Sequence, residues 1–151
     1  MNVDLRDWLK NGWLTEHQTS GQEIADLLGV IDRDAAACQT SGLNPDWQLN
    51  IAYNAALQVA TAALAAAGYR ASREAQHFRV IQSLAYTMGA DSQRIAQLQS
   101  YRKKRNISDY ERAGGVSQQE AKEMVALANE LRNDLMSWLA TNHPELLVAK
   151  P

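Results

Sequence analysis

Apolar residues recur along this chain at spacings of three and four, which is the period of an amphipathic helix. A short first helix is expected to end at Gly12, with Leu5, Trp8 and Leu9 on one face. The pattern predicts further helices over residues 20–42, 44–68, 72–89, 91–110 and 117–143. No stretch alternates apolar and polar residues for long, and no Asn-Gly pair marks a hairpin, so no strand is expected.

Residues that favour helix ends support these boundaries. Ser20 with Glu23, and Ser117 with Glu120, have the spacing of a capping box. The Asn44–Pro45 pair combines a capping side chain with a proline at the first helical position. We therefore expect an all-α protein, built as an antiparallel bundle of four main helices plus a short N-terminal helix. The 151 residues suit one domain, with its core over about residues 20–140.

The predicted helix over 72–89 has an apolar face that is expected to point inward. The residues of this face are Ala75, Phe78, Ile81, Ala85 and Met88. The helix over 44–68 carries many alanines, which either permit close contact with neighbouring helices or serve only helix propensity.

Charge and composition narrow the classes of function. The formal net charge is −2, so binding of nucleic acid would need a local basic patch. Cys38 is the only cysteine, which excludes an intramolecular disulfide and a cysteine-based zinc site. We expect a cytoplasmic protein without a membrane span, because no stretch approaches the ~18 uninterrupted apolar residues that a span needs and the first residues lack a signal-peptide pattern.

The segment over residues 101–110, YRKKRNISDY, has the most chemical content. Its four consecutive cations are Arg102, Lys103, Lys104 and Arg105. On a helix, Arg105 lies one turn from Asp109, and Arg102 lies one turn from Asn106. Guanidinium groups beside an amide and a carboxylate can hold a phosphate and a ribose. The alternative is an exposed helix end whose charges serve solubility and the helix dipole.

The same segment resembles the motif of the HEPN family. In that family an arginine, a polar residue and a few further residues lead to a histidine, and Arg105-Asn106 followed by Tyr110 is similar to bacterial branches with a tyrosine at the end. The helices over 46–68 and 117–139, and the stretch HFRVIQSLAYTMG, also resemble family elements in the same order. The resemblance covers roughly residues 20–140.

The resemblance implies a metal-independent ribonuclease that acts as a dimer, but Tyr110 stands where active members have histidine. A phenol with a pKa near 10 is a poor general base at neutral pH. Arg105 and Asn106 therefore carry over as binding residues, while Arg105, Asp109 and Tyr110 are only catalytic candidates. Arg70 and His77 also have the loose arginine-to-histidine spacing, but they fall in the wrong helix, and we expect His77 to be a surface or packing residue.

The histidines His17, His77 and His143 are scattered and lack paired spacing, so no metal site is predicted. We expect His17 to be solvated in a loop. No phosphate-binding glycine loop is present, and no cofactor is expected.

The leading hypothesis is a homodimer that binds RNA, a nucleotide or a protein partner through a basic cleft around Arg105. The resemblance implies a place in a toxin–antitoxin or defence system, beside a nucleotidyltransferase-type partner. The rival hypotheses are a ribonuclease with a divergent motif and a structural bundle without a ligand.

Overall fold

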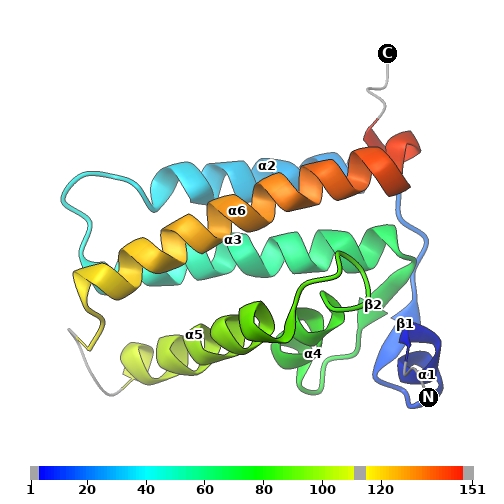
Figure 1. Ribbon diagram of the computed structural model, residues 1–151, viewed down its shortest axis with the longest axis horizontal. Coiled ribbons are helices and arrows are strands. Elements are labelled where there is room, and N and C mark those ends of the chain that lie inside the picture. Colours follow the sequence, from blue (N-terminus) through cyan, green and yellow to red (C-terminus); the bar gives the residue numbers. More distant parts are fainter. Residues whose placement is uncertain (1–3, 111–114, 148–151) are drawn as a thin grey trace.

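The computed structural model describes residues 4–110 and 115–147, with side chains described for 4–105 and 115–147. Helices make up most of these residues, which confirms the all-α class (Figure 1). The elements in chain order are α1 (Leu5–Lys10), β1 (Leu14–Glu16), α2 (Gly21–Ala37), α3 (Pro45–Ala66), β2 (Tyr69–Ala71), α4 (Gln76–Ser83), α5 (Ser92–Tyr110), α6 (Gln118–Asn142) and the 3-10 helix η1 (Pro144–Leu147).

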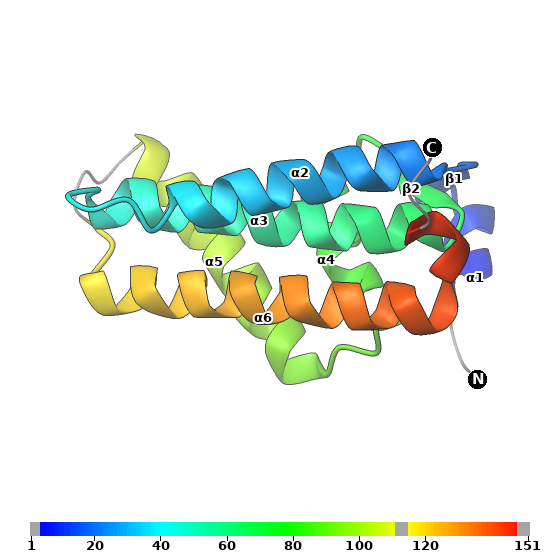
Figure 2. The ribbon, with the colours of Figure 1, turned by 90° about the horizontal axis from the view of Figure 1, so that it is seen from above.

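Helices α2, α3 and α6 lie side by side along the length of the molecule, and α5 crosses the other side of α3 (Figures 1 and 2). The chain runs in the same direction through α3 and α6 and in the opposite direction through α2. Helix α3 is central because it packs against α2, α6, α4 and α5. Its alanines are buried, and their small side chains let the neighbouring helices approach closely.

By length and composition α3 would pass as a candidate membrane span, but 72% of its most apolar window is buried inside the protein. The core helix of a folded domain meets the same criteria, so this feature is weak support for a membrane protein.

The predicted helix starts are largely present. Ser117 and Glu120 form a complete capping box at α6, and the Asn44 side chain accepts a hydrogen bond from the Trp47 backbone N–H at α3. At α2, the Ser20 side chain accepts from the Glu23 N–H at 3.1 Å. The Glu23 carboxylate does not complete this box, because it binds His17 and Thr19 instead. His17 is therefore not a solvated loop residue, and its side chain is only 20% exposed.

The small sheet was not expected. Strands β1 and β2 pair antiparallel with Leu14 opposite Ala71 and Glu16 opposite Tyr69. Each strand has three residues, too few for alternation to be recognised in the sequence. Gly68, with φ of +99°, makes the turn from α3 into β2. The sheet fixes the segments before α2 and after α3 against each other.

The helix expected over 72–89 is shorter and begins later. It starts after Ala75, which has a left-handed backbone with φ of +53°, and it ends at Ser83. The start at Ser72 was wrong because the Ser72 backbone N–H bonds to Trp13 and its hydroxyl to Gly12, both at the end of the sheet. The inward face is Val80, Ile81 and Leu84, whereas Phe78 is 42% exposed.

Candidate functional site

Helix α5 divides its four consecutive cations between different faces, because successive helical residues are turned by about 100°. Arg102 and Arg105, one turn apart, face α3 and α4. Lys104 faces α6, where it forms an ion pair with Glu120. Lys103 is exposed. The cations therefore do not form one continuous patch, and the two arginines are the pair that the fold brings together.

Arg105 lies over an aromatic ring of the central helix. Its guanidinium carbon is 5.4 Å from the centroid of the Tyr53 ring, which is a cation–π distance. Tyr53 is 1% exposed and fixed in the core of α3, so its ring is a rigid support. The Nε atom of Arg105 is buried as well. The sequence did not point to Tyr53, because its link to Arg105 joins helices about fifty residues apart.

The Tyr53 hydroxyl is buried and has no hydrogen-bond partner among the residues that the structure describes. Burial raises the pKa of Tyr53 to about 12, and the positive charges of Arg105 and Arg102 oppose part of this rise. The Arg105 guanidinium lies over the ring of the same residue, and Arg102 comes one turn earlier on α5. An unsatisfied buried hydroxyl is costly, so its position calls for an explanation.

His77 of α4 supplies a second ring at this place. Its centroid is 6.4 Å from that of Tyr53, with the planes inclined by 46°. Burial lowers the pKa of His77, and the charges of Arg105 and Arg102 lower it further. This shift favours the neutral imidazole beside two cations. His77 is exposed on the first turn of α4, which agrees with the expected surface position, and its ring also joins the arginine face.

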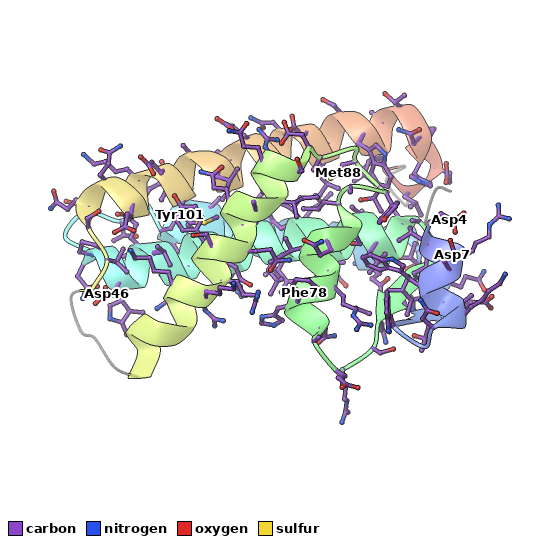
Figure 3. The ribbon with its side chains drawn as sticks, turned by 60° about the horizontal axis from the view of Figure 1, so that its bottom comes forward. Asp4, Asp7, Asp46, Phe78, Met88 and Tyr101 are labelled. Atoms are coloured by element: carbon purple, nitrogen blue, oxygen red, sulfur yellow. The ribbon has the colours of Figure 1, made fainter. Side chains whose placement is uncertain are left out.

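Arg102 is held in place by two contacts on α4 and α5. Its Nε donates to the Gln99 Oε1 at 2.7 Å, and its guanidinium carbon lies 5.7 Å from the Phe78 ring centroid. Gln99 in turn donates to the Phe78 carbonyl oxygen at 2.9 Å. Figure 3 labels Phe78 on α4, beside α5. An exposed aromatic ring therefore stands next to a positioned guanidinium.

We call Arg102, Arg105, Tyr53, His77 and Phe78 the arginine face. Its members come from α3, α4 and α5, and only the two arginines could be predicted from the sequence. The predicted side chains of Asn106, Asp109 and Tyr110 lie outside the described residues, although their backbone belongs to α5. The arginine face offers two cationic donors, a hydroxyl, a neutral imidazole and an aromatic surface.

Among the described residues, no three His, Cys, Asp or Glu side chains gather as metal ligands would. The chemistry of the arginine face is that of an anion site, since its donors are guanidinium groups.

The chain matches no protein-family model, no curated protein and no solved structure. The case for its function therefore depends on the residues of the arginine face and on the resemblance of the sequence motif.

Proposed function

We propose that this protein binds RNA or a nucleotide, and that the arginine face holds a phosphate group. The observation that carries the proposal is the pair of positioned guanidinium groups on α5, with Arg105 over the buried Tyr53 ring and Arg102, one turn earlier, over the exposed Phe78 ring. Paired guanidinium groups suit phosphate because each can donate two parallel hydrogen bonds to its oxygens. The Tyr53 hydroxyl is covered in the free protein, and it would donate a hydrogen bond to this phosphate once the Arg105 side chain, which lies over the ring, turns toward the ligand.

The neighbouring aromatic ring favours a nucleic acid over a simple anion. Phe78 is 42% exposed on a helix whose other large apolar side chains are buried. Single-stranded RNA is commonly bound by a base stacked on an aromatic side chain beside a cationic groove. Phe78 next to Arg102 provides this combination.

We extend the proposal to the family and the assembly. The order of the helices and the Arg105-Asn106 motif on α5 support a HEPN-like domain with four main helices, α2, α3, α5 and α6. Such a domain would act as a cytoplasmic homodimer, and a nucleotidyltransferase-type partner would belong to the same system.

His77 gives specific support to the second candidate, a metal-independent ribonuclease. Its imidazole takes a place beside Arg105 that Tyr110 cannot fill chemically at pH 7. A neutral imidazole can accept the proton of an RNA 2′-hydroxyl while that oxygen attacks the adjacent phosphorus. The P–O5′ bond then breaks, the O5′ oxygen takes a proton from water, and the imidazolium gives its proton to the hydroxide that is left, so that a 2′,3′-cyclic phosphate, a free 5′-hydroxyl and neutral His77 remain. Arg102 and Arg105 would stabilise the charge on the phosphate oxygens.

Binding is tested by titrating a labelled single-stranded RNA with wild-type protein, Arg102→Ala and Arg105→Ala. We expect each substitution to weaken binding at least tenfold and to lower the salt dependence by about one counterion. Arg105→Lys should restore only part of the affinity, because an ammonium cannot make the planar two-point contact. Lys103→Ala is the matched control on the exposed face of α5 and should lose less. Equal losses for Lys103 and both arginines would contradict the proposed face.

Cleavage is tested by incubating the protein with RNA in the presence and absence of EDTA. The ribonuclease hypothesis expects cleavage that survives EDTA, leaves cyclic phosphate ends and disappears in His77→Asn without loss of RNA binding. Intact RNA with tight binding would leave the binding function and reject the enzyme.

A further inference from the structure

A pocket of about 270 Å³ opens next to the arginine face, between α2, α3, α4 and β2. Its floor is apolar and includes Leu57, Leu64 and Val80, which are nearly fully buried. Polar side chains stand around the apolar floor, among them Gln58 of α3 and Gln76 of α4. The volume lies just below the range for drug-sized ligands, so the pocket fits one small ring system.

A charged network forms one wall of this pocket. The Glu23 Oε1 accepts hydrogen bonds from Thr19 at 2.5 Å and from the His17 Nε2 at 2.7 Å. The Oε2 atom faces the Arg70 guanidinium at 3.7 Å, which is longer than a hydrogen bond. The hydrogen bond from Thr19 lowers the pKa of Glu23 against the opposing effect of burial, so the carboxylate is ionised. Arg70 balances its charge, and the wall favours a neutral polar ligand.

The side-chain amide of Gln58 is a second polar group in the pocket that can form hydrogen bonds with a ligand. It forms no hydrogen bond within the described part of the chain, and its residue is half-buried. A side-chain amide offers one acceptor and two donors, which match the hydrogen-bonding edge of a nucleobase. Together, an apolar floor and a donor–acceptor wall are the features that hold a flat heterocycle.

The pocket and the arginine face share a boundary. His77 lines the pocket and also contacts the ring of Tyr53, over which Arg105 lies. Leu57 of the floor follows Tyr53 by four residues, about one turn of α3 and a rise of about 6 Å along the helix. A ligand with a phosphate at one end and a ring at the other can therefore occupy both places.

We infer that this pocket receives a nucleobase of the bound nucleotide or RNA, and that Glu23 Oε2 accepts a hydrogen bond from an exocyclic amino group of that base. The inference rests on the proposed function, because the phosphate at the arginine face sets the position of the base. A carboxylate acceptor favours bases that carry an amino group, such as cytosine, over uracil, which has none.

The test compares three labelled oligonucleotides of equal length, an oligocytidine, an oligouridine and an abasic strand, by fluorescence anisotropy. Wild-type protein should bind oligocytidine about fivefold more tightly than oligouridine, as expected for one net hydrogen bond, and should bind the abasic strand more weakly than both, because that strand has no ring to bury. Gln58→Leu and Glu23→Gln should each abolish this advantage. Gln93→Leu, an exposed glutamine on the first turn of α5, is the matched control and should retain it.

The outcomes separate the two proposals. Equal binding of the three strands by wild-type protein, or an unchanged cytidine advantage in Gln58→Leu, overturns the pocket while leaving the phosphate site intact. Binding of none of the strands overturns both. Glu23 also forms hydrogen bonds with Thr19 and His17, so the binding result for Glu23→Gln is interpreted only if the thermal melt of this variant matches that of the wild type. If the melts differ, the result for Gln58→Leu decides.

Discussion

Tyr53 shows how a single residue can place function and stability in opposition. Its ring is fully buried and carries Arg105, so the aromatic part is well packed. Its hydroxyl has no hydrogen-bond partner in the part of the chain that the structure describes. Phenylalanine would fill the same volume without this cost. A tyrosine at this position is therefore explained more readily by a ligand than by packing.

We predict that Tyr53→Phe stabilises the protein by about 1 kcal/mol, because an unsatisfied buried hydroxyl is removed. The same substitution should weaken RNA binding, since the proposed hydrogen bond to phosphate is lost. Urea denaturation and an RNA titration measure the two effects. A destabilised variant would mean that the hydroxyl is satisfied in solution, and unchanged binding would remove it from the site.

The lowered pKa of His77 leads to a prediction about how the free energy of unfolding depends on pH. Burial and two neighbouring arginines disfavour the imidazolium in the folded state, whereas the unfolded chain titrates near the usual pKa of 6.5. Below that pH the unfolded state binds more protons, so the contribution of His77 to stability is present above pH 6.5 and is lost as the pH falls. His77→Asn should remove this dependence.

The measurement is a pair of urea denaturation curves for each protein, at pH 5 and pH 7.5. Other groups titrate in this range, so only the difference between wild type and His77→Asn is interpreted. The stability of the wild type should fall more steeply toward pH 5 than that of the variant. A parallel fall of the two proteins would show that neither burial nor the two arginines lower the pKa of His77 in solution.

At the scale of elements, capping residues predicted the starts of α3 and α6 well because these signals are local. Asn44 and Ser117 accept hydrogen bonds from backbone N–H groups three residues away, and no distant group in the described part of the chain competes for these side chains. Glu23 behaves differently, since residues outside the helix, His17 and Thr19, compete for its carboxylate. Ser72 is drawn to the sheet in the same way. Sequence patterns fail where a long-range contact replaces a local one.

The candidate site followed the same rule. The basic segment of α5 was visible because its four cations are consecutive, and helical geometry then decided which of them act together. Arg102 and Arg105 share a face, whereas Lys104 pairs with Glu120. Tyr53 and His77 could not be found, because their contact joins α3 to α4. No spacing in the sequence marks such a pair.

The backbone conformation of Ala75 leads to a prediction about the start of α4. Its left-handed backbone, with φ of +53°, is unfavourable for a residue with a Cβ atom. Ala75→Gly should therefore stabilise the protein by roughly 0.5–1 kcal/mol, after the greater entropy of glycine in the unfolded chain is subtracted. Ala85→Gly, which follows α4 outside the left-handed region, is the control and should give no gain. Thermal melts of both variants decide, and a destabilised Ala75→Gly would contradict the strain.

At the scale of the whole molecule, the net charge of −2 gives no general attraction for RNA. Affinity has to come from the local field of the arginine face. Ion pairs such as those of Arg94 with Glu130 and Asp134, and of Arg132 with Asp32, neutralise other cations while they join helices. Arg102 and Arg105 bring two positive charges together where α5 crosses α3 and α4.

The surface at one end of the molecule leads to a prediction about assembly. Trp47, on the first turn of α3, is 60% exposed, more than the other large hydrophobic side chains on the described surface. The first turn of α3 and the last turns of α5 lie at the same end of the molecule (Figures 1 and 3). Exposed tryptophans are enriched among the residues that dominate protein interfaces. This end is therefore the part of the surface best suited to self-association near Arg105.

We predict a symmetric dimer at micromolar concentration, with the C-terminal part of α5 close to the two-fold axis. In such an interface the same patch is used twice, so one substitution removes two contacts. Trp47→Ser should shift the molecular mass measured by light scattering from dimer toward monomer, with little change in the melting of the monomer. Tyr86→Ser is the matched control, since Tyr86 is 42% exposed and packs on Trp8 of α1, at the other end of the molecule. It should leave the dimer intact. A wild-type protein that is monomeric at these concentrations would contradict the dimer, and a dimer that survives Trp47→Ser would place its interface elsewhere.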